Sequence, residues 1–354
     1  MKAPHFLRLL FGGFVCLLVI GCQSDFDLGT PSPQPTPLPS RYISSSTLDL
    51  VEIWRARTEF PNPSPDVQSP PFLYVTKDKV VMSSFVAGRS QDSYLTAFSL
   101  GTGAVLWQTR YPDPGFGTAT NTAYLDNASN KLYLAYSFRV SAFDLETGRQ
   151  LWTTENLGDH ESYTFPYEQV DPLQLQIDNT KENIKIDPSS GKVLSVQGTN
   201  LPRLRVPYKN ILMLDHGDYF GAFDGNGQLL WKIPHWAEFW PTFVNDEDFV
   251  IAFGRAKYWI WRVNAQTGQD RWRSSPDIVS NYVIWRDRVI ALREDGYLLS
   301  MDLETGQLFN YAIFDKDFKE AIGKRPFWVA ASDPYLYVYF GDTQELIAFQ
   351  ISAH

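Results

Sequence analysis

Two short acidic clusters contain the residue types that could hold a metal ion. Asp215-His216-Gly217-Asp218 combines carboxylates with an imidazole, and Asn245-Asp246-Glu247-Asp248 places four oxygen-bearing side chains in a row. Both lie between strand-like runs, where such residues commonly form turns, and the second lacks the twelve-residue pattern of a calcium loop. The sequence contains neither a Gly-x-Ser-x-Gly nucleophile motif nor a His-Glu-x-x-His zinc motif. We therefore expect solvated turns, with no catalytic residue, no metal ion and no cofactor.

A second set of oxygen-bearing residues belongs to a phrase that recurs six times, as in AFDLETGRQLW at residues 142–152. Each copy places such a residue ahead of a glycine, and the glycine is followed by an apolar pair that often ends in tryptophan. The glycines are Gly103, Gly148, Gly191, Gly227, Gly268 and Gly306, so the steps are 45, 43, 36, 41 and 38 residues. A repeat of this period is typical of an array or a propeller.

Each copy of the phrase predicts two antiparallel strands joined by a tight turn. The side chains that open the turn can accept a hydrogen bond from the backbone two residues on, and the glycine supplies a positive φ without steric cost. Two more strand-like runs precede the phrase, which gives four strands per unit. The opening residues are therefore interpreted as turn caps rather than catalytic acids: Ser99, Asp144, Asp187, Asp224, Asn264 and Asp302.

The tryptophan that ends the phrase is interpreted as packing between neighbouring units rather than as a ligand contact. Aromatic residues make up 15% of the chain, and large flat side chains suit packing between stacked sheets. In the six copies of the phrase this last position, which we call the tryptophan column, is occupied by Trp107, Trp152, Ser195, Trp231, Trp272 and Asn310.

Two fragments near the ends of the sequence complete one more unit. The run at residues 346–350 reads as a third strand, and Ile53 with Trp54 supplies the apolar-tryptophan pair of the missing outer strand. Six complete units and one split unit predict an all-β fold, a seven-bladed β-propeller of four-stranded antiparallel blades. An N-terminal strand would complete the C-terminal blade and hide an edge that would otherwise promote aggregation.

Residues 1–21 are predicted to be a signal peptide. Lys2 and Arg8 precede an apolar stretch at residues 9–20, which is too short for a bilayer-spanning helix of about 20 residues. The stretch ends in Val19-Ile20-Gly21-Cys22, which resembles the bacterial lipobox. That resemblance implies cleavage before Cys22 and lipidation of its sulfur and amine. The alternative is an ordinary signal peptide with an incidental cysteine.

Residues 22–48 are expected to form a Pro/Ser-rich tether between the lipidated Cys22 and the propeller at residues 49–354. Alternate residues from Pro31 to Pro39 are proline, which favours an extended polyproline conformation. Loss of Lys2 and Arg8 with the signal peptide would change the formal charge from −9 to −11. An acidic protein of this kind opposes nucleic-acid binding. The mature chain would have no disulfide, because Cys16 lies in the removed segment.

The phrase at residues 142–152 is similar to the repeat of the pyrroloquinoline-quinone-type (PQQ-like) propellers, and the similarity extends over nearly all of residues 50–354. One branch of that family, the quinoprotein dehydrogenases, typically has eight blades and two adjacent cysteines against the quinone. This chain has no cysteine after Cys22, so quinone-dependent oxidation is not expected. The other branch is BamB, the propeller lipoprotein of the outer-membrane β-barrel assembly machinery. This chain resembles BamB in having a lipobox followed by a propeller, although the sequence predicts seven blades rather than eight.

The resemblance to BamB implies that the partners are envelope or outer-membrane proteins. Gln23, rather than an aspartate, follows Cys22. By resemblance to lipoprotein sorting, this favours the outer membrane if the organism has two membranes. In an organism with one membrane the protein would lie outside the cell.

One rim of the propeller is the expected binding surface, because it carries the loops between blades and those that join second to third strands. Aromatic residues beside charges in these loops suit protein recognition, although Trp236 is equally consistent with packing at a blade start. The candidate partner surface comprises His160, Glu161, His235, Trp236, Glu238, Lys316, Phe318 and Lys319.

These features favour a non-catalytic, lipid-anchored, monomeric propeller outside the cytoplasm that acts as a protein-binding scaffold in the cell envelope. Under the resemblance to BamB, the process would be outer-membrane protein assembly. Two alternatives stay open: an enzyme or small-molecule site at the ring axis, and carbohydrate binding through exposed rim aromatics.

Overall fold

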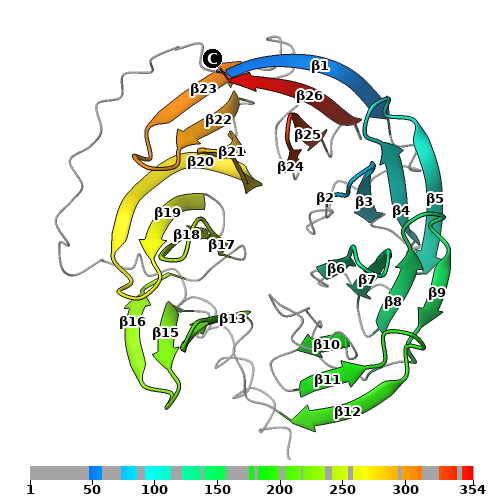
Figure 1. Cartoon of the computed structure of the whole chain (residues 1–354), viewed down its shortest axis with the longest axis horizontal. Helices are drawn as coiled ribbons and strands as arrows, with labels where there is room; N and C mark the ends of the chain where they lie inside the picture. Colours follow the sequence, from blue (N-terminus) through cyan, green and yellow to red (C-terminus); the bar gives the residue numbers. More distant parts are fainter. Residues whose placement is uncertain are drawn as a thin grey trace, which may run out of the picture. The chain divides into compact units, whose positions relative to one another are not determined.

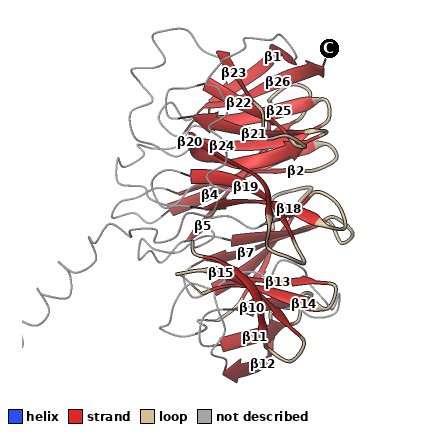
Figure 2. Cartoon of the chain, turned by 90° about the vertical axis from the view of Figure 1, so that its left-hand side faces the viewer, coloured by secondary structure: helices blue, strands red, loops and turns tan. Residues whose placement is uncertain are grey.

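The described part of the protein is an all-β unit. The computed structural model describes residues 48–57, 73–85, 92–112, 122–136, 139–155, 157, 175–178, 182–198, 204–216, 218–235, 241–253, 258–293, 297–312, 327–340 and 345–353. All of them belong to one compact unit, residues 42–354. Strands and their connecting turns make up these residues, with no helix among them (Figure 2).

Twenty-six strands are described, and their bounds agree with the repeated phrase. In chain order they are β1 (Leu48–Arg57), β2 (Leu73–Val75), β3 (Lys79–Phe85), β4 (Asp92–Ser99), β5 (Val105–Pro112), β6 (Thr122–Asp126), β7 (Lys131–Tyr136), β8 (Arg139–Asp144), β9 (Gln150–Thr153), β10 (Leu175–Asp178), β11 (Glu182–Ile186), β12 (Val193–Gly198), β13 (Leu204–Tyr208), β14 (Ile211–Asp215), β15 (Phe220–Asp224), β16 (Leu229–Ile233), β17 (Thr242–Phe243), β18 (Asp248–Phe253), β19 (Tyr258–Asn264), β20 (Asp270–Trp285), β21 (Arg288–Arg293), β22 (Tyr297–Asp302), β23 (Leu308–Ala312), β24 (Phe327–Ser332), β25 (Tyr335–Phe340) and β26 (Glu345–Ala353).

The strands pair into seven antiparallel blades that follow one another around a ring (Figure 1). Blade 1 contains β2–β5, blade 2 β6–β9, blade 3 β10–β12, blade 4 β13–β16, blade 5 β17–β20, blade 6 β20–β23, and blade 7 β24–β26 with β1. Blade 3 has three described strands, and residues 158–174 before it lie outside the described residues. The predicted seven-bladed propeller is confirmed.

Strand β20 belongs to two blades. Its first half is the outer strand of blade 5, and its second half is the inner strand of blade 6. Ile278 pairs with Tyr258 of β19 on one side and with Arg293 of β21 on the other. This shared strand joins blades 5, 6 and 7 into one eleven-stranded hydrogen-bonded sheet.

The ring closes where the two ends of the propeller sequence meet, as predicted. Strand β1 pairs antiparallel with β26, with Trp54 opposite Ala348. Trp107 faces Ala97 in the same manner within blade 1. Figure 1 shows the blue β1 running along the outside of the red β26. The N-terminal strand therefore occupies the outer position that the C-terminal strands leave open.

The oxygen-bearing residue at the start of the phrase caps the turn in five of the six copies, at Asp144, Asp187, Asp224, Asn264 and Asp302, which confirms the interpretation from sequence for these five. In blade 2 the Asp144 carboxylate accepts hydrogen bonds from the backbone N–H groups of Glu146 at 3.1 Å and Thr147 at 2.8 Å. The Gly148 N–H donates to the Asp144 carbonyl at 2.8 Å. Gly148 has φ 71°, a conformation that residues with a Cβ adopt only at a steric cost.

Each tryptophan of the column docks onto the turn of the next blade. The indole of Trp107 lies against Gly148, and its Nε1 donates to the carbonyl of Leu145 at 3.1 Å. The other pairs are Trp54 with Gly103, Trp152 with Gly191, Trp231 with Gly268, and Trp272 with Gly306. The tryptophans therefore hold blades together, as predicted.

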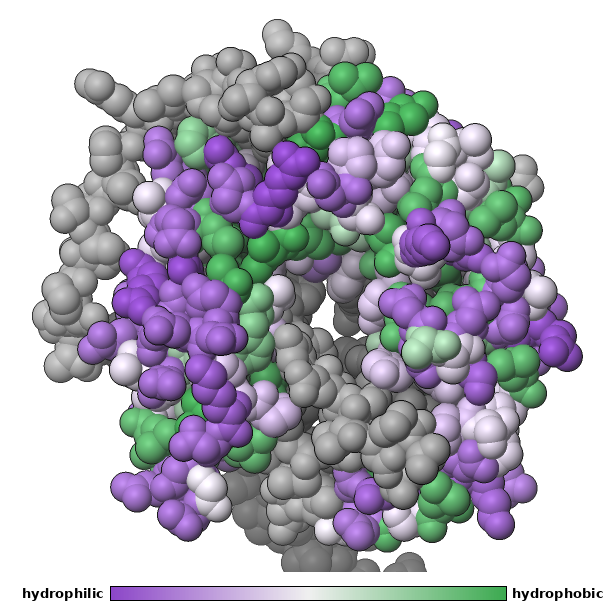
Figure 3. Space-filling model, in the orientation of Figure 1, coloured by the Kyte–Doolittle hydropathy of each residue, from purple (hydrophilic) through white to green (hydrophobic). Residues whose placement is uncertain are grey.

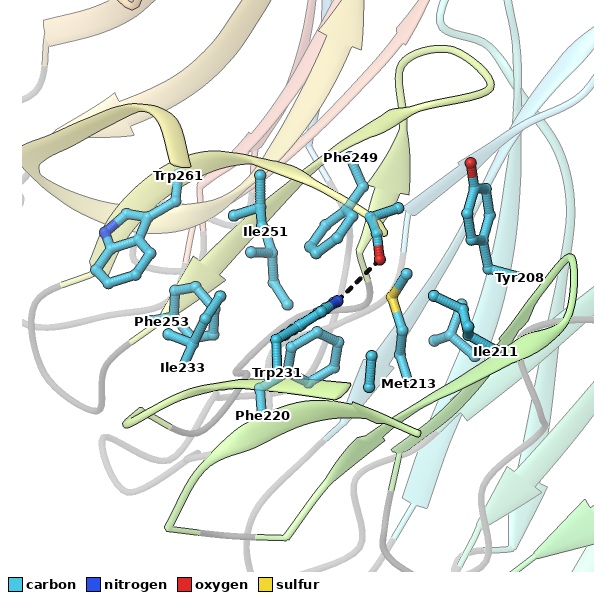
Figure 4. Packing of buried hydrophobic residues seen from close by; sticks show 14 residues of the cluster. Tyr208, Ile211, Met213, Phe220, Trp231, Ile233, Phe249, Ile251, Phe253 and Trp261 are labelled. Carbon is cyan, nitrogen blue, oxygen red and sulfur yellow. Dashed lines mark hydrogen bonds between the residues drawn. The ribbon is translucent and has the colours of Figure 1, made fainter. Parts of the chain in front are cut away.

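The hydrophobic core is divided among the joints between blades. Six clusters of buried residues fill six joints, from the joint of blades 4 and 5 around to that of blades 2 and 3. Figure 4 shows the cluster between blades 4 and 5, where the dashed line joins Trp231 to the carbonyl of Ala265 at 3.1 Å. Among the described residues, no such cluster joins blades 3 and 4.

Candidate functional site

The structure places one member of the predicted partner surface. His235 is described, whereas Cys22, His160, Glu161, Trp236, Glu238, Lys316, Phe318 and Lys319 lie outside the described residues. For these positions the sequence-based expectations remain predictions.

His235 follows the outer strand of blade 4 and enters an aromatic pocket of blade 5. Its backbone N–H donates to the carbonyl of Ile233 at 2.8 Å, so the chain bends sharply after β16. The imidazole meets Trp259 edge-on, with ring centroids 4.9 Å apart, and Trp261 edge-on at 5.6 Å. Phe253 lies on a third side at 6.1 Å. Aromatic residues of blade 5 therefore surround the half-buried imidazole that blade 4 supplies.

Strand pairing explains why the aromatic rings of blade 5 meet. Trp259 and Trp261 are two residues apart on β19, and residues at that spacing share one face of a strand. Phe253 of β18 lies directly opposite Trp259. Figure 4 shows Phe253 and Trp261 together at one end of the buried cluster, with Tyr208 at the other end.

An arginine adds positive charge to this aromatic group. Arg273 of β20 is paired with Trp261 in the sheet, and its guanidinium lies 4.1 Å from the centroid of the Trp261 ring. Arg273 also donates to both carboxylate oxygens of Asp270, at 2.6 and 2.8 Å. A planar guanidinium that is stacked and paired in this way is held in one orientation.

The pocket favours the neutral form of the imidazole. Burial lowers the pKa of His235 from its ordinary value of 6.5, and the charge of Arg273 lowers this pKa further. A neutral imidazole has one nitrogen that donates and one that accepts. Trp261 is buried and supports the group from below, whereas the partly exposed Trp259, His235 and Arg273 can offer flat apolar surface, polar nitrogen atoms and a fixed cation to a partner. We call these four residues the His235 cluster.

Most of this cluster was not singled out from the sequence. Trp259 and Trp261 stand in the run YWIWRVN, whose alternation predicts one aromatic face, but only the register shows that Arg273 stacks on it. That register depends on a bulge between Arg262 and Val263. Counting residues outward from the glycine turn on both strands, with one residue added for the bulge, places Arg273 opposite Trp261.

Each of the two acidic clusters contains one buried aspartate, so neither is the fully solvated turn that the sequence predicts. Asn245 accepts hydrogen bonds from the N–H groups of Glu247 and Asp248, both at 2.8 Å, as expected for a turn. Asp248, however, is buried rather than solvated, and it forms an ion pair with the buried Arg262 at 2.8 Å. Asp215 is also buried. Within the described residues, no group of three or more His, Cys, Asp or Glu side chains could hold a metal ion.

The arginine that pairs with Asp248 also links two blades. Arg262 of blade 5 donates to the carbonyl of Leu303 in the blade 6 turn at 2.8 Å and contacts Glu304 at 2.9 Å. Lys79 of blade 1 contacts Glu146 in the blade 2 turn in the same way, at 2.7 Å. These buried cations stabilise joints, since a buried charge must be paired.

On the face shown in Figure 3, hydrophilic side chains cover much of the described surface of blades 4 to 6, and hydrophobic ones gather nearer the middle of the ring. No helix formed by the described residues is long and apolar enough to cross a membrane.

Comparisons with known proteins agree with the repeat and the ring. A model of the family described as outer membrane protein assembly factor BamB matches residues 51–165 and 139–352. The crystal structure of BamB from Moraxella catarrhalis matches with a TM-score of 0.53 and 13% identity, covering 86% of this chain and 99% of that one. The C-terminal WD40 domain of Sif2 matches with a TM-score of 0.59, 10% identity and the same coverages. By sequence, no curated protein matches significantly.

Proposed function

The chain belongs to the family described as outer membrane protein assembly factor BamB, and on this basis we propose that it is a non-catalytic protein-binding scaffold of the cell envelope, acting in outer-membrane protein assembly. The observation that carries the proposal is the family match over residues 51–165 and 139–352. The similarity to solved propellers, at 13% identity or below, supports the fold alone.

The His235 cluster is the described surface that suits a partner best. It combines tryptophan and arginine, two residue types that dominate the energetics of protein interfaces. Its members come from two blades, so a partner would contact a surface that only the closed ring assembles. We assign the first contact of the proposed partner to this cluster and to the neighbouring loops predicted from sequence.

Attachment through Cys22 is part of the proposal. The sequence before Cys22 resembles a lipobox, and the tether at residues 22–48 would hold the propeller away from the lipid surface. Partners would then be envelope or outer-membrane proteins, and the location would be extracytoplasmic. In this proposal the lipid anchors the protein to the membrane, the tether sets the distance between membrane and propeller, and the ring provides the binding surface.

The test is co-purification from solubilised envelopes of the native organism, together with the levels of outer-membrane β-barrel proteins in a deletion strain. We expect assembly proteins to co-purify with the full-length chain, and β-barrel protein levels to fall when the chain is deleted. Arg273→Ser should weaken co-purification. Arg55→Ser is the matched control, because Arg55 forms an equivalent pair with Glu52 three residues away, on β1 of blade 7.

Two results together would contradict the proposal: no envelope protein that co-purifies above background, and β-barrel protein levels that stay unchanged in the deletion strain. Equal loss of co-purification with Arg273→Ser and Arg55→Ser would leave the scaffold role standing but remove the His235 cluster from it.

A further inference from the structure

Of the six phrase turns, the one in blade 4 receives no tryptophan from the preceding blade. In five joints an indole of one blade lies against the turn glycine of the next blade. In each of these five, its Nε1 donates to the carbonyl of the second residue of that turn, at 2.7 to 3.1 Å. The five slots therefore share one shape and one hydrogen-bond acceptor, and they define what fits there.

At the joint of blades 3 and 4 the equivalent position is Ser195. Ser195 of β12 lies opposite Lys185 of β11, just as Trp107 lies opposite Ala97, and a bulge follows at the same place in both pairs. The strand therefore has the correct register but carries a small hydroxyl side chain. The change is in the residue and not in the position of the backbone.

The turn that would receive the indole is nevertheless formed. Gly227 has φ 79°, and its N–H donates to the Asp224 carbonyl at 3.0 Å. The Asp224 carboxylate caps the turn through the N–H of Asn226 at 2.9 Å. This turn is one residue shorter than the others, and its second residue is Gly225, whose carbonyl is the equivalent acceptor.

The slot above this turn is open. A Cβ built on Gly227 meets no atom of the described residues within 4 Å, whereas one built on Gly148 lies 2.5 Å from Trp107 Cδ2. Gly227 is exposed, while Gly148 is buried. Among the described residues, no hydrophobic cluster spans this joint. Leu230 of β16 adds exposed apolar surface on the blade 4 side of this joint, because its neighbour Trp231 faces blade 5.

We propose that the open slot at Gly227 is a docking site for an aromatic side chain, preferably an indole, on an extended segment of a partner protein. The five filled slots indicate this occupant, because each shows an indole against a positive-φ turn glycine with its N–H bonded to a turn carbonyl, and the shorter turn at Gly227 keeps both the positive-φ glycine and the preceding carbonyls. The partner would thereby supply the contact that Ser195 does not make. The exposed side chain of Leu230 would be covered by the rest of the segment.

This site is separate from the His235 cluster and does not depend on outer-membrane assembly as the process. Loss of β-barrel proteins in a deletion strain tests the proposed function, whereas binding of a defined peptide in solution tests the slot. Either can fail without the other.

The probe is a fluorescein-labelled peptide with the sequence of residues 147–155, TGRQLWTTE, which carries the indole in the context of a natural docking strand. Its binding to the full-length protein is followed by fluorescence anisotropy. The control peptide has serine in place of tryptophan. We expect binding of the tryptophan peptide and at least tenfold weaker binding of the serine peptide.

Ser195→Trp should fill the slot from within and weaken binding of the tryptophan peptide at least tenfold. Leu194→Trp is the matched control, because adjacent residues of a strand project from opposite faces, so this indole cannot enter the slot and binding should persist. A third peptide, with benzoylphenylalanine in place of tryptophan, should cross-link to residues 224–228 of the unmodified protein. That measurement requires no variant to fold.

Three results would overturn the proposal. The serine peptide could bind as tightly as the tryptophan peptide, or cross-links could map away from residues 224–228. The unmodified protein could also form a dimer in solution that Ser195→Trp dissociates, in which case a second copy, and not a different protein, occupies the slot.

Discussion

The indole of Trp107 in blade 1 lies so close to Gly148 of blade 2 that a Cβ on that glycine would be 2.5 Å from Trp107 Cδ2. The glycine is required twice, once for its positive φ and once for the space that the indole occupies. At Gly227 only the first requirement applies, because no atom from the described part of the chain lies within 4 Å of a Cβ there. The chain thus contains a natural comparison between a filled and an open slot.

Alanine substitution separates these two requirements. Gly227→Ala should lower the free energy of unfolding by about 1–2 kcal/mol, the cost of a left-handed conformation for a residue with a Cβ. Gly148→Ala should cost a further ~1–3 kcal/mol, because the methyl group overpacks the joint. Urea unfolding of the two variants measures the difference. Equal losses would show that the indole moves aside without cost.

The carboxylates that cap the turns should make the folded protein less stable as the pH falls into the acid range. Hydrogen bonds from the Ser189 and Ser190 side chains and the Ser189 N–H lower the pKa of Asp187 from 3.8 to about 2. Because the folded pKa is depressed, the stabilisation is fully present above 3.8 and is lost as the pH falls through about 2. Asp187→Asn should therefore melt at a lower temperature than the unmodified protein at pH 6, and at nearly the same temperature at pH 2.

Asp144→Asn is the parallel test. The Asp144 carboxylate accepts hydrogen bonds from the Thr147 side chain and from the N–H groups of Thr147 and Glu146, which lower its pKa, so this variant should show the same pH dependence as Asp187→Asn. If the difference in melting temperature between Asp187→Asn and the unmodified protein is the same at both pH values, hydrogen bonding to the carboxylate is not the cause.

His235 should titrate below an ordinary histidine. Burial, and then the charge of Arg273, lowers its pKa from 6.5. The unfolded chain therefore takes up the proton first as the pH falls. The stabilisation is present above 6.5 and is lost as the pH falls through the folded value. An NMR titration of the imidazole Cε1 proton should give a midpoint below 6.5, and Arg273→Ser should raise that midpoint. A midpoint at or above 6.5 would mean that the pocket does not exclude water.

The fold could be predicted largely from the sequence because its contacts repeat. Asp144, Gly148 and Trp152 recur in register, so turn chemistry, blade count and the role of Trp54 in ring closure follow from local rules. The shared strand β20 could not be predicted, because residues 270–285 contain no glycine turn to separate blade 5 from blade 6. Hydrogen bonding on both sides of Ile278 appears only in three dimensions.

The site was less predictable than the fold. His235 was selected for its position in a rim loop, but Arg273 was not, because the stacking on Trp261 depends on a cross-strand pair and a bulge. The burial of Asp248 was missed for a related reason: its partner Arg262 lies on the neighbouring strand, and a run of acidic residues by itself indicates a solvated turn.

Cys22 can be tested against the other cysteine of the sequence. If the lipobox is processed as predicted, Cys22→Ser should abolish acylation and release the protein from the membrane fraction, because no other cysteine follows it. Cys16→Ser should change neither property, since Cys16 lies in the removed segment. Mass spectrometry of the N-terminal peptide and membrane fractionation provide the readouts. An unacylated mature protein that remains membrane-bound would require another anchor.

The joint of blades 3 and 4 should be the first part of the ring to open. Local opening is easiest where few apolar contacts are buried, and among the described residues this joint has neither a docked tryptophan nor a hydrophobic cluster. Hydrogen exchange followed by mass spectrometry should show faster exchange for residues 220–233 than for the equivalent residues 139–153, although both contain a capped glycine turn. Ser195→Trp should slow exchange at residues 220–233, because a docked indole adds buried contacts to the turn, and Leu194→Trp should not. Equal protection of the two segments in the unmodified protein would show that the joint is closed by other means, and the slot would then be unavailable to a partner.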